Sequence, residues 1–133
     1  MSEPLVLVDS SVWIRHLTRH AADASRHIDE LLNAHRVATN AVIRLELLTG
    51  ARDEAQYADL EDALHGLHDL PLSDAVWRRA ERLRFTLRSR GRVIPVPDVL
   101  IACCALVHDC AILHADRHFD AIARATPLKI YHP

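Results

Sequence analysis

The sequence has little of several features that define large protein classes. No apolar run reaches the roughly 18 residues that a membrane-spanning helix needs. No basic stretch precedes the first apolar run, so we expect residues 1–11 to contain a first strand rather than a signal peptide. No repeat, low-complexity tract or linker divides the 133 residues. The sequence therefore predicts one globular domain over residues 1–133.

Cysteine and lysine are also scarce. The three cysteines, an odd number, are Cys103, Cys104 and Cys110, in or beside an apolar segment. This pattern is typical of buried, reduced thiols in a cytoplasmic protein. Lys129 is the only lysine among 16 basic residues, which face 18 acidic ones, so the net charge is −2. That balance argues against a strongly basic nucleic-acid coat and against an acidic disordered tail.

Half of the residues are hydrophobic, and they are arranged in short apolar runs that alternate with helical patterns. This alternation predicts an α/β fold, a three-layer α/β/α domain with a central, mostly parallel sheet. We expect strands at 5–8, 37–39, 69–72 (weak), 111–115 and 128–130. We expect helices from Ser10 or Ser11 to about 18, then at 22–34, 41–49, 52–67, from 73 or 74 to Gly91, at 97–107 and at 116–125.

Two aspartates directly follow the clearest strands, Asp9 after LVLV and Asp116 after AILHA. Ligands of parallel α/β sheets bind at the carboxyl ends of strands, so both side chains should meet at one edge. Asp98 begins an almost wholly apolar helix. Each of the three could instead simply cap a helix, where the dipole favours a carboxylate by about 0.3–1 kcal/mol.

Glu46 is harder to explain as a capping or surface residue, because its neighbours on a helix are aliphatic. A surface salt bridge is the simpler alternative, although Arg44, two positions away, does not face it. If the four acids converge, carboxylates about 4 Å apart repel by roughly 4 kcal/mol at an effective dielectric constant near 20. Oxygen-only ligands suit Mg²⁺ or Mn²⁺, and such a site can hydrolyse phosphodiesters with water activated by the metal.

Four motifs in this order resemble those of PIN-domain proteins, and the chain's size and motif order resemble VapC ribonuclease toxins of type II toxin–antitoxin pairs. The motifs are DSSVWI at 9–14, ELLTG at 46–50, PDVLIA at 97–102 and LHADRHF at 113–119. The resemblance spans nearly the whole chain. It implies a three-layer α/β/α fold, a Mg²⁺- or Mn²⁺-dependent endoribonuclease, a homodimer and inhibition by a cognate VapB-type antitoxin.

The resemblance also implies roles for individual residues. Asp9, Glu46, Asp98 and Asp116 become the catalytic and metal-binding quartet, with Asp9 and Asp98 as the principal ligands. Ser11 would orient the Asp9 carboxylate, and Asp120 would be an accessory acid. The chain departs from the family pattern at His114 and Ala115, where Asn or Thr is common, which bears on a second metal. Val12, Trp13 and Ile14, with the leucine-rich face of the helix from 22, are candidate antitoxin contacts.

Residues 78–92 contain seven arginines and one glutamate, a local charge of +6. They form either a solvated helix face or a ridge that contacts RNA phosphates. We take Arg78, Arg82, Arg92 and, beside the fourth motif, Arg117 as RNA-binding candidates. His108, His114 and His118 lack the paired spacing of a zinc site.

Two other functions remain open from the sequence. The chain could be a non-catalytic PIN-like module that binds RNA or regulates. A phosphatase or phosphotransferase with Asp9 as nucleophile is disfavoured, because the expected second aspartate is replaced by Ser11.

Overall fold

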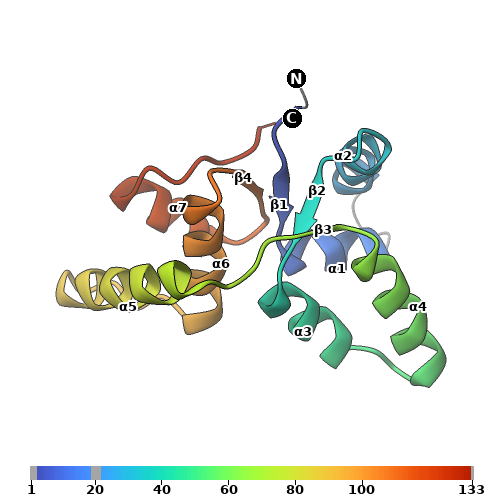
Figure 1. Ribbon diagram of the computed structural model, residues 1–133, viewed down its shortest axis with the longest axis horizontal. Helices are drawn as coiled ribbons and strands as arrows, with labels where there is room; N and C mark the ends of the chain where they lie inside the picture. The colour runs from blue at the N-terminus through green and yellow to red at the C-terminus, as the bar shows by residue number, and fades with distance from the viewer. Residues whose placement is uncertain (1–2, 19–21, 133) are drawn as a thin grey trace.

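The computed structural model describes residues 3–18 and 22–132, and its centre is a parallel four-stranded sheet (Figure 1). The strands are β1 (Val6–Val8), β2 (Val37–Thr39), β3 (His68–Asp69) and β4 (Ala111–Leu113), in the order β3-β2-β1-β4. β1 pairs in parallel with both β2 and β4, and β2 with β3. The expected α/β class with a parallel sheet is confirmed.

The described part of the chain has seven helices, six between successive strands and one, α7, after β4. They are α1 (Ser10–Thr18), α2 (Ala22–Asn33), α3 (Ala41–Thr49), α4 (Glu54–His65), α5 (Asp74–Ser89), α6 (Val96–Val107) and α7 (Arg117–Ala125). None of the described helices is long and apolar enough to cross a membrane.

The direction of the strand connections reverses at β1. The chain runs from β1 outward to β2 and β3, with α1–α4 between them, and then returns past β1 to β4 through α5 and α6. Because such crossovers are nearly always right-handed, the two groups of helices cover opposite faces. Figure 1 shows α5–α7 and α2–α4 on opposite sides of the strands. The carboxyl ends of β1 and β4 therefore flank a topological switch point, where ligands of open α/β sheets bind.

The core consists of the strands and one central helix. β1 and β2 are buried along their whole length, which explains their continuous apolar runs. Helix α6 is buried without interruption from Val99 to Ala105, as an all-apolar helix requires. Cys103 and Cys104 within α6, and Cys110 just after it, are buried free thiols. Burial raises the pKa of Cys103 and of Cys110 to about 11.

Two expected strands differ from the structure. The strand predicted at 69–72 is the pair His68–Asp69, because Pro71 has no N–H to continue the ladder. The strand predicted at 128–130 is reduced to a single bridge between Ile112 and Ile130, held by two backbone hydrogen bonds. Neither difference affects the strand ends that carry the acidic residues.

Candidate active site at the sheet switch point

Asp9 is the most buried member of the predicted quartet, with 3% of its surface exposed. It follows β1 directly and caps α1: its Oδ2 accepts the Ser11 backbone N–H at 3.1 Å, and its carbonyl accepts from Val12 and Trp13. The helix therefore begins at Ser10, one of the two starts expected, and Asp9 is its cap. Capping and a functional role are compatible here, because only one carboxylate oxygen is used.

Ser11 connects the ends of the two strands that flank the switch point. Its Oγ donates to Asp9 Oδ2 at 2.6 Å and accepts the N–H of Ala115 at 3.0 Å, just beyond β4. The N–H of Asp9 itself donates to the carbonyl of Leu113 at 3.0 Å. A single hydroxyl thus fixes the Asp9 carboxylate relative to the segment that carries Asp116.

Glu46 reaches the site from α3. This helix begins sharply because Asn40 Oδ1 accepts the Ile43 N–H at 3.0 Å. Ser10 Oγ donates to Glu46 Oε1 at 3.1 Å, so Glu46 faces the start of α1. The expectation that aliphatic residues enclose Glu46 was wrong: the residue is exposed at the rim, while Ile43 and Leu47 occupy the buried face. Arg44 pairs with Asp69 instead.

Asp98 lies in the first turn of α6, a helix that packs against both β4 and α5. Its side chain is 13% exposed, and its Oδ2 lies 2.7 Å from His118 Nδ1. Burial raises the pKa of Asp98, the hydrogen bond from His118 opposes this, and the charges of Asp116 and Asp9 raise it further.

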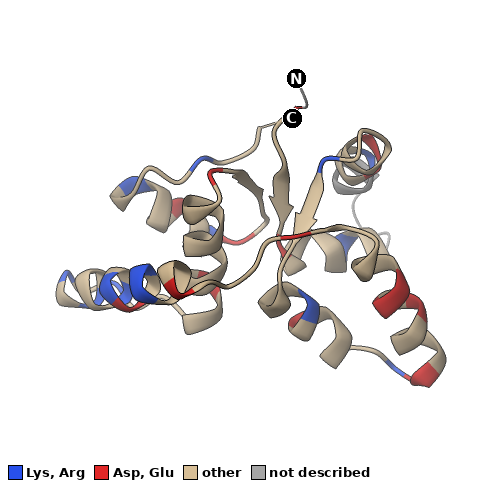
Figure 2. Ribbon diagram, in the orientation of Figure 1, with Lys and Arg blue, Asp and Glu red and all other residues tan. Residues whose placement is uncertain are grey.

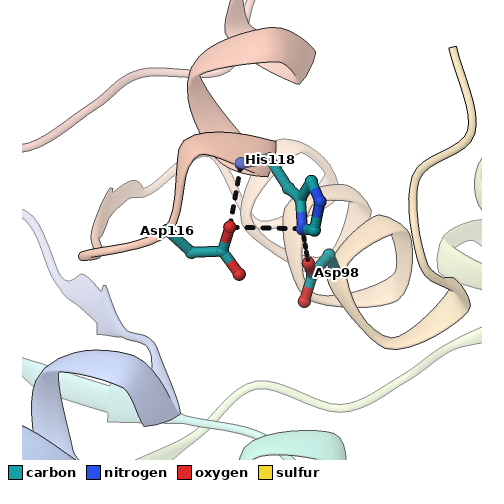
Figure 3. Close-up of side chains that lie close together, drawn as sticks. All are labelled: Asp98, Asp116 and His118. Atoms are coloured by element: carbon teal, nitrogen blue, oxygen red, sulfur yellow. Dashed lines mark hydrogen bonds and ion pairs between the residues drawn. The ribbon is translucent and has the colours of Figure 1, made fainter.

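Asp116 is at once the N-cap of α7 and a neighbour of Asp98. Its Oδ1 accepts the His118 backbone N–H at 2.9 Å and lies 3.2 Å from His118 Nδ1. Figure 3 shows the imidazole edge between the two carboxylates. Ligand atoms of Asp98, Asp116 and His118 lie within 4.8 Å of one another, which makes them a candidate metal-binding group among the described residues.

The electrostatics connect all four acids. Burial raises the pKa of Glu46, a hydrogen bond from Ser10 opposes this, and the charges of Asp9, Asp98 and Asp116 raise it further. The structure therefore brings the four predicted carboxylates close enough to repel, although the other three lie 37 to 107 positions after Asp9 in the sequence. A cation would relieve this repulsion.

A buried oxygen of Asp9 supports a cation in this position. Asp9 Oδ1 is inaccessible to solvent and has no hydrogen-bond partner among the described residues. Leaving such an oxygen unsatisfied costs about 1–3 kcal/mol or more for a charged group. The donor set, mainly carboxylate oxygens, suits a hard divalent ion. The residues present thus fit a divalent metal site.

Asp120 does not join this group. Its Oδ1 lies 3.2 Å from His114 Nε2, and His114 Nδ1 accepts the Asp116 N–H at 3.1 Å. Because Nδ1 accepts a hydrogen bond, the proton of neutral His114 lies on Nε2 and points to Asp120. His114 therefore links Asp120 to the backbone at Asp116. The His114 side chain separates Asp120, the expected accessory acid, from the group of four carboxylates.

His118 is the site residue that sequence reasoning missed. The sequence placed it only in a loose group with His108 and His114, whose spacing does not suit a zinc site. The relevant signal was its position two residues after Asp116 at a helix start, where the side chain turns back toward the capping carboxylate.

The four predicted RNA-binding arginines, Arg78, Arg82, Arg92 and Arg117, are all exposed. Three of them belong to α5 and the segment after it, and Figure 2 shows several stretches of Lys and Arg, in blue, along the ribbon of α5, which packs on α6. Arg84 is different, because its Nε donates to the Ile94 carbonyl at 3.1 Å and holds the loop before α6.

The fold and the site together define an α/β protein with an acidic cluster at the switch point of a parallel sheet. The PIN domain family matches residues 6–125. Ribonuclease VapC11 of Mycobacterium tuberculosis is 33% identical over 129 residues, covering 94% of this chain and 96% of the relative. The chain therefore belongs to the PIN-domain family, among its VapC ribonucleases.

Solved structures agree with this assignment. VapBC2 from Rickettsia felis, bound to a DNA fragment from its promoter, superposes with a TM-score of 0.79 at 18% identity, over 96% of this chain and 97% of that one. VapBC-5 from M. tuberculosis, a member of the VapBC family of toxin–antitoxin systems, has a TM-score of 0.68 at 27% identity, over 98% and 100%.

Proposed function

We propose that the protein is the toxin of a type II toxin–antitoxin pair, an endoribonuclease that depends on Mg²⁺ or Mn²⁺. The observation that carries the proposal is the buried, unpartnered oxygen of Asp9 within a group of four mutually repelling carboxylates. Its relatives named ribonuclease support RNA as the substrate.

In this proposal the four acids have distinct tasks. Asp9 and Asp98 are the principal ligands, and Glu46 and Asp116 complete the shell directly or through water. A divalent ion bound there supplies an activated water and neutralises charge that develops on the phosphate. Ser11 holds Asp9 Oδ2 in a hydrogen bond, so that Oδ1 would remain available to hold the ion. We expect hydrolysis without participation of the ribose 2′-hydroxyl, which leaves a 3′-hydroxyl and a 5′-phosphate.

Contacts to the RNA backbone are proposed for Arg78, Arg82, Arg92 and Arg117. All four are exposed, and the first three belong to a segment with a local charge of +6. RNA is a polyanion, and the four carboxylates alone would repel it. Positive charge close to the site is therefore needed to bind the RNA backbone.

The proposed protein partner is a VapB-type antitoxin, as in the VapBC complexes that share this fold. A hollow of about 220 Å³ between α1, α2, α3 and α4 is lined mainly by leucines and Trp13. It fits the apolar face of a partner helix. Val12 and Trp13, expected to be contacts, are 3% and 8% exposed, so the contact would fall on Leu17 and Leu32 at the rim.

We also propose a homodimer and a cytoplasmic location. The dimer is supported by four exposed large apolar residues on and between α5 and α6, namely Trp77, Phe85, Val93 and Val96. A groove of about 430 Å³ lies between these helices. Exposed apolar patches of this kind mark protein interfaces. Three buried free thiols are consistent with a reducing compartment.

The decisive test is Asp98→Asn, with Asp74→Asn as the matched control. Both aspartates stand in the first turn of a long helix, so both variants lose the same dipole interaction. We expect Asp98→Asn to reduce RNA cleavage in Mg²⁺ or Mn²⁺ by 100-fold or more and Asp74→Asn to cleave at the wild-type rate, with unchanged circular dichroism in both.

Cleavage by Asp98→Asn at the wild-type rate would overturn the site. RNA binding that persists in EDTA, together with no Mg²⁺ or Mn²⁺ binding in calorimetry, would instead favour a non-catalytic RNA-binding module. Mapping the 5′ ends of cellular RNA after induced expression would identify the target.

A further inference from the structure

We propose that His118 binds the divalent ion directly through Nδ1, and that this nitrogen ligand makes the site select Mn²⁺ over Mg²⁺. The inference rests on the proposed metal-dependent function and adds a ligand to the acidic quartet. It also assigns a metal preference that four carboxylates alone would not produce.

The first argument is spacing. His118 Nδ1 lies 2.7 Å from Asp98 Oδ2 and 3.2 Å from Asp116 Oδ1. Ligand atoms on adjacent vertices of an octahedron, each about 2.1 Å from the ion, are about 3 Å apart. His118 Nδ1 therefore lies as far from each of these two oxygens as adjacent ligands in one coordination shell do, and the ligand atoms of all three residues lie within 4.8 Å of one another. Figure 3 shows that the same ring nitrogen, Nδ1, lies next to both carboxylates. One ion bound between the two acids could therefore also bind this nitrogen.

The second argument is that the backbone holds the ring in place. The His118 N–H donates to Asp116 Oδ1 at 2.9 Å, and the next residue, Phe119, is fully buried in the core. The first turn of α7 is thus anchored, and the imidazole needs only side-chain rotation to adjust. A ligand whose backbone is already fixed loses little freedom when it binds.

The third argument is a comparison with His114, the other nearby imidazole. Both of its nitrogens are engaged, Nδ1 by the Asp116 N–H and Nε2 by Asp120. It has no lone pair to offer. His118 Nδ1, in contrast, faces the carboxylates of Asp98 and Asp116, which would themselves turn to the ion. Of the two, His118 is the one that can change from hydrogen-bond donor to ligand.

The preference follows from ligand chemistry. Mg²⁺ dehydrates reluctantly and favours oxygen ligands, whereas imidazole nitrogen is a common ligand of transition metals. Mn²⁺ accepts carboxylates as readily as Mg²⁺ does and also accepts nitrogen. One imidazole among several carboxylates therefore favours Mn²⁺ without excluding a six-coordinate shell.

The test compares wild type with His118→Asn, using His108→Asn as the control. An Asn side chain places an amide near the position of Nδ1, so it can still hydrogen-bond to Asp98. His108 is the C-cap of α6, at the end opposite to Asp98, and its Nε2 forms a hydrogen bond with the Pro71 carbonyl at 2.9 Å. Mn²⁺ and Mg²⁺ affinities are measured by calorimetry, and pulsed electron paramagnetic resonance of bound Mn²⁺ detects a directly coordinated nitrogen.

We expect nitrogen-14 modulation in wild type and in His108→Asn, and its loss in His118→Asn. His118→Asn should weaken Mn²⁺ binding tenfold or more while changing Mg²⁺ binding less than threefold. Bound Mn²⁺ without nitrogen modulation in wild type, or the same modulation in His118→Asn, would overturn the proposal. So would equal losses of Mn²⁺ and Mg²⁺ affinity, which a purely structural role predicts.

These readouts separate the inference from the proposed function. A wild-type protein that shows the nitrogen signal with Mn²⁺ but does not cleave RNA would contradict the ribonuclease proposal alone. Cleavage that proceeds while bound Mn²⁺ shows no nitrogen ligand would contradict only the assignment of His118.

Discussion

Replacing Ser11 with alanine tests how the site is held together. The Ser11 hydroxyl donates to Asp9 Oδ2 at 2.6 Å and accepts from the Ala115 N–H at 3.0 Å. Alanine removes both bonds but keeps the backbone bond from residue 11 to Asp9, which does not need the side chain. The substitution therefore disconnects the Asp9 carboxylate from the end of β4 without removing any acid.

The magnitude follows from these contacts. A hydrogen bond to a charged group contributes about 1.5–3 kcal/mol, and Asp9 is buried, so water does not replace the lost donor. Ala115 is exposed, and its N–H can bond to water at little cost. We expect Ser11→Ala to lower the free energy of unfolding by about 2 kcal/mol, or roughly 8 °C in melting temperature. Loss of orientation should also weaken divalent-metal affinity about 10–100-fold.

The assay is thermal unfolding in EDTA, followed by metal titration in calorimetry. Ser89→Ala is the matched control, since its hydroxyl also makes a short bond, at 2.7 Å to the Thr86 carbonyl, but at an exposed helix end. That variant should lose less than about 0.5 kcal/mol and keep its metal affinity. Equal melting temperatures for the two variants, or unchanged metal affinity in Ser11→Ala, would refute the reasoning.

Two further predictions concern the core and the surface. The thiols of Cys103 and Cys110, whose pKa burial raises to about 11, should not react with Ellman's reagent at pH 8 until the protein is unfolded in guanidinium. Because unfolded thiols ionise first, their contribution to stability is complete below about pH 9 and is lost toward pH 11, which urea titrations across that range would detect. Phe85→Asp should convert a dimer to a monomer in light scattering, whereas Tyr57→Asp, an exposed aromatic on α4, should stay dimeric; a monomeric wild type at tens of micromolar would contradict the proposed interface.

The strand ends were predictable because local rules governed them. A continuous apolar run followed by an aspartate predicts a buried strand that ends at a polar edge, and β1 with Asp9 follows this rule. The all-apolar pattern of α6 likewise predicted a central helix with Asp98 at its start. In both cases the deciding energy is the burial of residues that are adjacent in the sequence.

The surroundings of Glu46 were not predictable in the same way. Its aliphatic neighbours suggested enclosure, yet α3 turns Ile43 and Leu47 into the core and leaves Glu46 at the rim. Which face of a short amphipathic helix is buried depends on the elements that pack against it, here α1, α4 and α6. The partner that Glu46 gained, the hydroxyl of Ser10, is 36 positions away.

The sequence by itself determined which residues are the candidates for the chemistry. The four acids, the serine two positions after the first, and the arginine-rich segment 78–92 could all be identified from their spacing and neighbours. Such features depend on residue type, local propensity and periodicity, which a linear sequence contains in full.

Only the tertiary structure decided how these residues meet. It left Asp9 with one buried oxygen that has no partner in the described part of the chain, paired Asp120 with His114, and placed His118 against Asp98. These outcomes depend on strand order and on the turn from β4 into α7, which bring together groups as much as 104 positions apart. The physical reason is that hydrogen bonds and charge repulsion act over a few ångströms in space, and sequence distance does not set that separation.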